Sequence, residues 1–222
     1  GLRGWFEWGH YNLFEHAMSL LQLTRVTYQP FEDTPAYEYS YSTSLTLRQP
    51  YFLNSWIEAS TTTLFEKVSY VHHDEEKLAI NLLLRNMVTL RREISLLLEI
   101  NQRNIFNVAA DEADQSIVDN RGRNFTNLVS PLVMFDRRDD RFNPERGYTW
   151  MARGTLAGGP LLAGSINFHR FSIEGSYLFP LYRLDNSEPF VLAARLKLGR
   201  VKAFGGTPSV PPTEAFNIGG AK

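Results

Sequence analysis

Residues 37–48 read YEYSYSTSLTLR, and the strict alternation of this stretch decides the fold. Its odd positions, from Tyr37 to Leu47, carry tyrosine, threonine and leucine, whereas its even positions carry glutamate, serine, threonine and arginine. Successive side chains of an extended strand point to opposite faces. The stretch therefore predicts a β-strand with one mostly apolar and one polar face.

The same period of two recurs on both sides of this segment. Leucine and isoleucine alternate with charged, serine or amide side chains at residues 77–89, 92–101 and 190–197. Weaker versions occupy residues 2–11, 16–28, 55–68, 125–138, 147–157 and 165–180. The pattern predicts an all-β chain of roughly ten strands, without helical periodicity.

The length of these alternating stretches points to a membrane. They extend over roughly 10–14 residues, whereas strands of soluble proteins average five or six. A tilted strand that crosses a bilayer needs about 9–11 residues, with its apolar side chains facing lipid. We therefore expect a transmembrane antiparallel β-barrel. Because open sheet edges cannot face hydrocarbon, either these strands close on themselves or further strands complete the wall.

Composition excludes several classes of function. The chain has 23 basic and 24 acidic residues, so it has no net field to attract nucleic acid. It has no cysteine, which excludes disulfides and thiolate metal sites. No run of about 18 apolar residues provides a transmembrane helix. The first residues do not resemble a signal peptide, and because a membrane barrel must be exported, we expect the sequence to be a fragment.

A charged turn, FDRRDDRFNPERG at residues 135–147, joins two predicted strands. Asn143-Pro144 favours the start of a turn, and Gly147 permits unusual backbone angles. Successive connections between strands lie at alternate ends of the sheet and therefore form two sets. The turn at 135–147 belongs to one set, and the longest connection, residues 107–124, belongs to the other. Outer-membrane barrels place long loops outside the cell and short turns in the periplasm. The turn at 135–147 is therefore predicted to lie at the periplasmic rim.

Two segments carry a resemblance to a known family. The charged turn resembles the motif D-x-R-D-x-x-F-x-P-x-x-G of the BamA/TamA family of bacterial outer-membrane assembly barrels, through Asp136, Arg138, Asp139, Phe142, Pro144 and Gly147. Residues 211–220 resemble that family's P-x-x-E-R-F-x-x-G-G stretch through Pro211, Glu214, Phe216, Gly219 and Gly220. Ala215 stands where the family has arginine. Weaker likenesses occur at residues 12–14, at 48–52 and at 168–180, where Asn167 replaces the family's aspartate.

The resemblance implies a sixteen-stranded outer-membrane barrel, of which residues 1–222 form the domain with about ten strands. It implies that the first strand, the last five strands and a set of periplasmic repeat domains lie outside this sequence. The segment with Glu214, Phe216, Gly219 and Gly220 would lead into a surface loop that folds back into the lumen.

The same resemblance implies a protein of the bacterial outer membrane that folds and inserts other barrel proteins without acting as an enzyme and without cofactors. Its partners would be unfolded outer-membrane clients and outer-membrane lipids, with accessory lipoproteins or an inner-membrane partner as further candidates, and no nucleic acid. The alternatives are a TamA-like or two-partner-secretion translocation barrel, a passive channel and a soluble β-rich binding domain.

Candidate sites are few. No nucleophile, base and metal ligands converge in the sequence. His72-His73-Asp74-Glu75-Glu76 is the best metal candidate, but adjacent residues of an extended chain point in opposite directions. The glycine pairs Gly158-Gly159 and Gly205-Gly206 lack the strand-to-helix context of a phosphate loop and are interpreted as surface turns. For Asp136, Arg138 and Asp139 two interpretations stay open, a charge-paired turn that fixes register and a rim that meets neighbouring domains.

Overall fold

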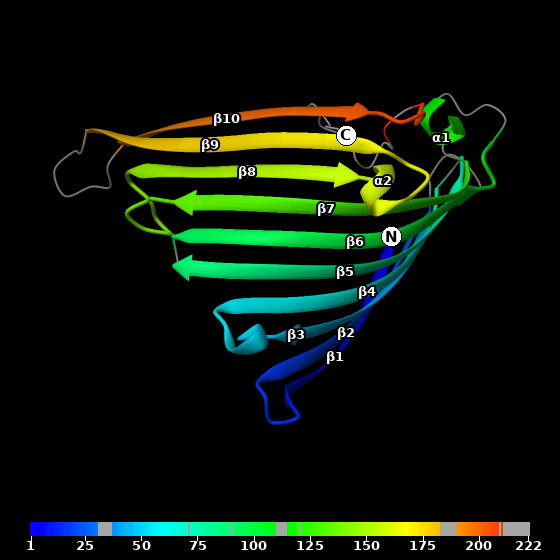
Figure 1. Ribbon diagram of the computed structural model, residues 1–222, viewed down its shortest axis with the longest axis horizontal. Coiled ribbons are helices and arrows are strands. Elements are labelled where there is room, and N and C mark those ends of the chain that lie inside the picture. The colour runs from blue at the N-terminus through cyan, green and yellow to red at the C-terminus, as the bar shows by residue number, and fades with distance from the viewer. Residues whose placement is uncertain are drawn as a thin grey trace.

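A computed structural model of the chain describes residues 1–30, 37–70, 72–89, 91–109, 115–119, 121–182, 190–208 and 210. These residues form one antiparallel sheet of ten strands, whose spatial order is the order of the chain (Figure 1). The strands are β1 (Leu2–Leu13), β2 (Met18–Pro30), β3 (Tyr37–Gln49), β4 (Ile57–Ser69), β5 (Asp74–Thr89), β6 (Arg92–Phe106), β7 (Gly122–Asp136), β8 (Gly147–Ala157), β9 (Phe168–Tyr182) and β10 (Phe190–Ala203). The predicted all-β chain of about ten strands is confirmed.

Three short helical segments were not predicted from the sequence. They are η1 (Phe52–Asn54), α1 (Gln115–Asp119) and α2 (Gly159–Leu162). None exceeds five residues. Segments of this length span little more than one helical turn, so they cannot show a 3.6-residue periodicity in the sequence. Among the described residues, neither α-helix has the length and apolarity needed to cross a membrane.

The sheet has two chemically distinct faces. We call the face that carries Ile80 and Leu82 of β5 the apolar face, and the face that carries Ala79 and Asn81 the polar face. The register places Ile80 beside Ile100 of β6, so the apolar rows continue from strand to strand. Ile80 and Ile100 are 49% and 62% exposed, whereas Ala79 of the polar face is 1% exposed. Side chains crowd on the inside of a curve and spread on its outside, so the polar face is the concave one.

The concave face is crossed by ion pairs between strands. Glu58 of β4 accepts hydrogen bonds from Arg48 of β3 and from Arg85 of β5, the latter at 2.8 Å. Lys77 of β5 lies 3.6 Å from Glu99 of β6. Charged side chains of both signs would be unfavourable in a dry core unless fully paired, but they suit a solvated interior. This arrangement places the polar side chains on the concave face, where the sequence predicted a lumen lining.

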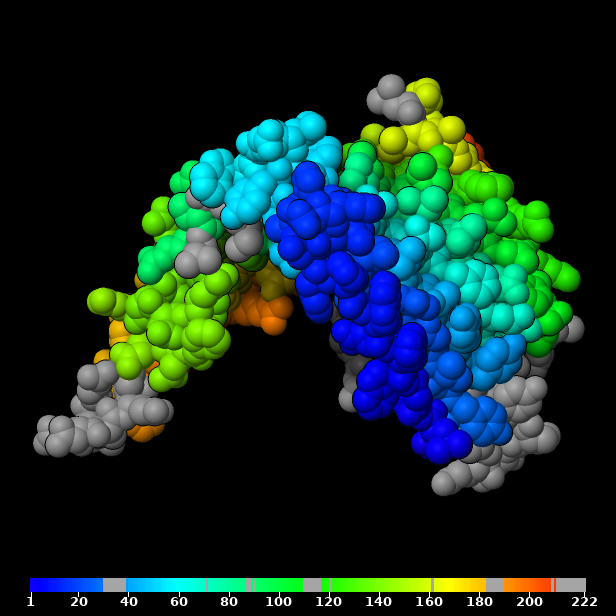
Figure 2. All heavy atoms as spheres, turned by 90° about the horizontal axis from the view of Figure 1, so that it is seen from below, coloured from blue at the N-terminus to red at the C-terminus, as the bar shows by residue number. Residues whose placement is uncertain are grey.

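The described sheet is curved but does not close. β1 and β10 form its opposite edges, and each pairs with a single neighbour. Figure 1 shows these two strands at opposite ends of the sheet, and Figure 2 shows the sheet bent into an arch with a hollow beneath it. The backbone groups on the outer edges of β1 and β10 are therefore available for pairing with further strands.

The connections lie at two ends of the sheet, as the alternation of strands requires. One end holds η1 and the β7–β8 connection, and the other holds α1 and α2 (Figure 1). The predicted surface turn at Gly158-Gly159-Pro160 was partly wrong, because Gly158 is buried and α2 begins at Gly159. A small hydrophobic cluster of Leu128, Ala157, Ile166 and Phe168 lies beneath this connection.

Candidate functional site

The β7–β8 turn, residues 137–146, is fixed to the end of β7 by Asp136. The Asp136 carboxylate accepts hydrogen bonds from Arg138 through its backbone N–H at 3.1 Å, its Nε at 3.0 Å and its Nη2 at 2.7 Å. The Asp136 N–H donates to the Arg91 carbonyl in the neighbouring β5–β6 connection at 2.9 Å. One residue therefore ties two adjacent connections together and orients the guanidinium of Arg138 in a two-pronged ion pair.

Asp139 and Asp140 organise the interior of the turn through backbone hydrogen bonds. Oδ1 of Asp139 accepts from the N–H groups of Asp140, Glu145 and Arg146 at 3.0, 3.1 and 3.2 Å. Oδ1 of Asp140 accepts from the N–H groups of Phe142 and Asn143 at 2.6 and 2.9 Å. A turn without regular secondary structure leaves its amides unpaired, and these two carboxylates satisfy them.

Gly147 closes the turn at the start of β8. Its φ of +111° lies in a region that residues with a side chain rarely adopt. A Cβ at this position would overlap the Arg137 carbonyl oxygen and lie 2.7 Å from the Arg138 Cα, both backbone atoms. The sequence interpretation of Gly147 as a backbone requirement is confirmed by this geometry.

Phe142 and Pro144 differ in their surroundings. Pro144 is half-buried within the turn. Phe142 is 98% exposed at the tip, and its ring contributes nothing visible to the packing of the turn. The turn is therefore held by its carboxylates and not by packing of the Phe142 ring.

The turn borders a cavity of about 510 Å³ on the polar face, lined by Asp136, Arg138 and Arg141 together with Glu174 of β9 and Arg195 of β10. Glu174 accepts a hydrogen bond from Nε of Arg195 at 2.9 Å. Glu174 and Arg195 pair across strands, whereas Asp136 and Arg138 pair at the start of the turn. The described lining of the cavity includes no nucleophile placed beside a general base. The arrangement can orient a polar polypeptide or hold the rim rigid, and it offers no catalytic step.

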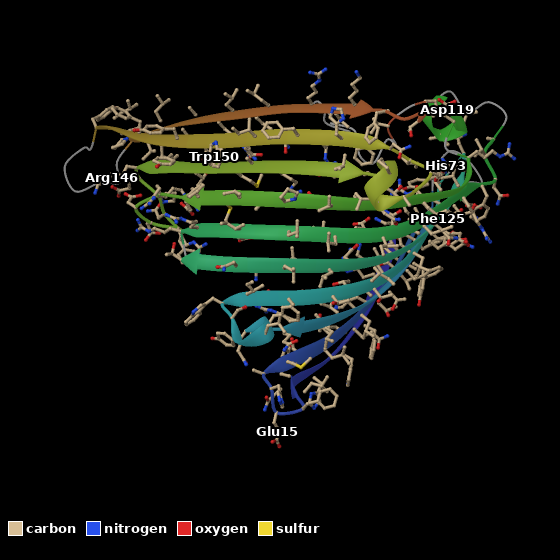
Figure 3. All side chains as sticks on the ribbon, viewed as in Figure 1. Glu15, His73, Asp119, Phe125, Arg146 and Trp150 are labelled. Atoms are coloured by element: carbon tan, nitrogen blue, oxygen red, sulfur yellow. The ribbon has the colours of Figure 1, made fainter. Side chains whose placement is uncertain are left out.

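The same end of the sheet has an aromatic border on its apolar face. The rings of Phe135 and Trp150 lie 5.6 Å apart, and the Arg92 guanidinium lies 5.6 Å from the centre of the Phe135 ring. Figure 3 shows Trp150 and Arg146 towards this end, with Phe125, His73 and Asp119 at the other. Aromatic rings beside a cation are typical of the membrane–water interface, which agrees with a rim position for the turn.

The His72–Glu76 candidate does not assemble a metal site in the part of the chain that the structure describes. No group of three or more histidine, cysteine, aspartate or glutamate side chains converges there. The His73 ring stacks on Tyr70 with centroids 4.6 Å apart. Asp74 instead accepts hydrogen bonds from Ser69 and from Asn107, the latter at 2.6 Å.

The second predicted motif, Glu214, Phe216, Gly219 and Gly220, lies outside the described residues.

Asn167, which the sequence showed only as a departure from a family motif, has a larger structural role than the sequence indicated. Its Oδ1 accepts a hydrogen bond from the Gly159 N–H at the start of the β8–β9 connection, and its backbone bonds to Phe204 and Thr207 in the chain that follows β10. In the sequence, the glycine pairs 158–159 and 205–206, which lie near Asn167 in the fold, could have indicated this close approach.

The turn carboxylates give a prediction about pH. Backbone donation from Asn143 and Phe142 holds the pKa of Asp140 below its usual range. A depressed folded pKa stabilises the turn above the unfolded pKa of about 4, and this stabilisation is lost as the pH falls through the folded value. Asp140→Asn should therefore lower the urea midpoint of unfolding at pH 7, and the gap to the unsubstituted protein should narrow below pH 4. A gap independent of pH would contradict the assignment.

Comparison with known proteins agrees with this geometry. The family model described as "Omp85 superfamily domain" matches residues 24–222. The solved structure of BamA from Haemophilus ducreyi lacking POTRA domains 1–3 is similar, with a TM-score of 0.67 and 13% sequence identity. That match covers 98% of this chain and 44% of the BamA chain, so the protein described here spans less than half of it. No curated protein sequence matches. The chain belongs to the Omp85 superfamily of bacterial outer-membrane β-barrels.

Proposed function

We propose that this protein folds and inserts β-barrel clients into the bacterial outer membrane, as a BamA-like assembly factor. The observation that carries the proposal is the likeness of its sheet to a BamA barrel over 98% of the chain. The TamA-like and secretion alternatives share the superfamily, and the experiment below separates them.

The physics of the wall supports this function. A client strand that enters the membrane with unpaired backbone groups faces a cost of several kcal/mol for each group. Pairing with a strand edge by β-augmentation satisfies those groups before they meet lipid. The ten strands supply the stable part of such a wall, because ion pairs on the concave face and apolar rows on the convex face fix their register.

On this proposal the β7–β8 turn is a contact surface at the periplasmic rim. Asp136, Arg138 and Asp139 hold the turn rigid, and Gly147 lets it close against β7. The rigid turn presents the exposed ring of Phe142, beside the cationic Arg141, to clients, to accessory lipoproteins or to preceding periplasmic domains. The segment with Glu214, Phe216, Gly219 and Gly220 would serve the same activity from the lumen.

The test uses cells that depend on the protein. Depletion should lower the amount of folded client barrels, which are recognised by their heat-modifiable migration on gels. Phe142→Ser should lower client assembly several-fold while the level and folding of the protein itself stay unchanged, because the ring is 98% exposed. Leu53→Ser is the matched control, since Leu53 is 79% exposed in the β3–β4 connection at the same end of the sheet.

The outcomes separate the candidate functions. If client barrels stay normal after depletion and a secreted protein is retained in the periplasm, the function is translocation and not barrel assembly. Normal clients and steady conductance in planar bilayers would indicate a passive channel. Equal effects of the Phe142 and Leu53 substitutions would remove the special role of the rim turn.

A further inference from the structure

The apolar face has a hollow where β8, β9 and β10 pair. Gly175, the eighth of the fifteen residues of β9, lies between Trp150 of β8 and Leu196 of β10 in the register of the sheet. Tyr148 and Tyr177 pair with each other in the next row of the same face. These residues line a cavity of about 430 Å³, which we call the Gly175 notch. Its volume lies within the range of ligand pockets, about 300–1,000 Å³.

The backbone does not require glycine at position 175. Gly175 is not among the residues with a positive φ. A Cβ there would meet only the Thr149 carbonyl oxygen, at 3.7 Å, which is ordinary van der Waals contact. Glycine weakens the interior of a strand, and it often marks a place where a ligand approaches the backbone closely. The notch is therefore a space that a side chain could fill and that the sequence leaves open.

Further strands of the wall would not cover the notch. β9 pairs with β8 on one side and with β10 on the other. A strand added beyond β10 would extend the sheet in its own plane, whereas the notch opens perpendicular to that plane. An outer-membrane barrel turns its apolar face towards the hydrocarbon of the bilayer. The notch therefore opens into lipid.

A cation lies at the outer end of the row that contains Gly175. Arg92, the first residue of β6, pairs with Phe135, Phe135 pairs with Trp150, and Trp150 pairs with Gly175. The Arg92 guanidinium is exposed beside the Phe135 ring and forms no ion pair with a carboxylate of the described residues. Its planar donors match the geometry of a phosphate group. The row therefore offers a phosphate-binding group at one end and an apolar hollow at the other.

The row has the direction and the length of a lipid chain. It begins at the start of β6 and reaches the middle of β9, and β9 extends beyond β6 at this end of the sheet (Figure 1). Gly175 therefore lies deeper in the membrane than Arg92. Three strand spacings separate the two residues, about 14 Å. The hydrocarbon of one leaflet is about 15 Å thick, which is half of a typical bilayer core.

We propose that the Gly175 notch binds one acyl chain of an anionic phospholipid whose phosphate is bound by Arg92. The chain crosses the rings of Phe135 and Trp150 and fills the hollow, where it gains dispersion contacts that a flat wall does not offer. Arg92 selects the headgroup, because the ammonium of a zwitterionic lipid offsets the attraction of its own phosphate. The site belongs to the outer surface of the wall and is independent of which client or cargo the barrel serves.

Trp150 reports on the notch because its ring lines it. In the test, every other tryptophan of the intact protein, including Trp5, Trp8 and Trp56, is replaced by phenylalanine. The protein is folded into vesicles of phosphatidylcholine that contain a minor fraction of a phospholipid brominated on its acyl chains, which quenches tryptophan emission on contact. Brominated phosphatidylglycerol, which is anionic, should quench Trp150 at a several-fold lower mole fraction than brominated phosphatidylcholine. Arg92→Gln should remove this difference between the two lipids.

Gly175→Leu should fill the notch and lower the quenching by both lipids several-fold. Gly154→Leu is the matched control, because Gly154 lies on the same face of β8, opposite Phe171 and outside the notch. A Cβ at 154 would meet only the Pro131 side chain, at 3.9 Å, so this variant adds the same side chain without disturbing Trp150. Both variants should keep the heat-modifiable migration of the folded barrel, since neither position crowds the backbone.

Three outcomes would overturn the proposal. Equal quenching by the two brominated lipids in the protein with Arg92 would show that no headgroup is selected. Equal quenching of Trp150 in the Gly175 and Gly154 variants would show that no acyl chain occupies the notch. A folded protein that neither lipid quenches would show that another protein surface, such as a second copy of this chain, covers the notch.

Discussion

Replacing Leu82 with arginine should destabilise the folded barrel by about 2–4 kcal/mol, whereas the same change at Leu83 should cost little. The two leucines are adjacent in β5 and are both half-buried. Leu82 lies on the apolar face beside Thr61 and Leu98, and Leu83 lies on the polar face beside Ser60 and Leu97. An arginine at 82 would enter the hydrocarbon layer, and an arginine at 83 would enter a wet interior that already contains charged side chains.

This pair of variants isolates the orientation of the wall, because residue type, strand and depth are nearly the same. The measurement is urea unfolding of the protein folded into lipid vesicles, followed by tryptophan emission from its four tryptophans. A larger loss of stability for Leu83→Arg than for Leu82→Arg would show that the polar face contacts lipid and that the assignment of the two faces is wrong. Equal losses would indicate that neither face contacts lipid.

The strands and their faces could be predicted from the sequence because both depend on local geometry. The alternation at residues 37–48 is a direct consequence of the period of two, and the structure places Tyr41 and Leu45 on the apolar face, 37% and 47% exposed. The need for glycine at 147 could also be anticipated, since a turn between two strands often requires a positive φ. These inferences need no knowledge of distant contacts.

The cross-strand contacts could not be predicted in the same way. The ion pairs of Glu58 with Arg48 and Arg85 depend on the register of three strands, which the apolar pattern and the geometry of the turns set together. The hydrogen bonds of Asn167 to Thr207 join segments 40 residues apart. A sequence pattern indicates which way a side chain points but not which distant residue it meets, so these contacts emerged from the structure alone.

Replacing Gly147 with alanine should cost about 3 kcal/mol or more and should lower the yield of folded barrel. The φ of +111° is unfavourable for alanine, and the added Cβ would also overlap the Arg137 carbonyl oxygen. The Arg137 oxygen belongs to the backbone of the same closed turn, so the overlap can be relieved only if the turn opens. Opening it would break the donation from Arg137 N–H to the Tyr148 carbonyl at 2.8 Å and weaken the ion pair of Asp136 with Arg138.

Gly122→Ala is the control that separates strain from crowding. Gly122 also has a positive φ, +90°, but a Cβ there would meet nothing within 4 Å. Gly122→Ala should therefore lower the stability by only about 1 kcal/mol, which is the cost of a side chain at a positive φ. The fraction of each variant that shows heat-modifiable migration and its urea midpoint give the comparison. If the two alanine variants lose the same stability, the close approach of the β7 end to Gly147 does not hold the turn, and the rigid rim that presents Phe142 loses its physical basis.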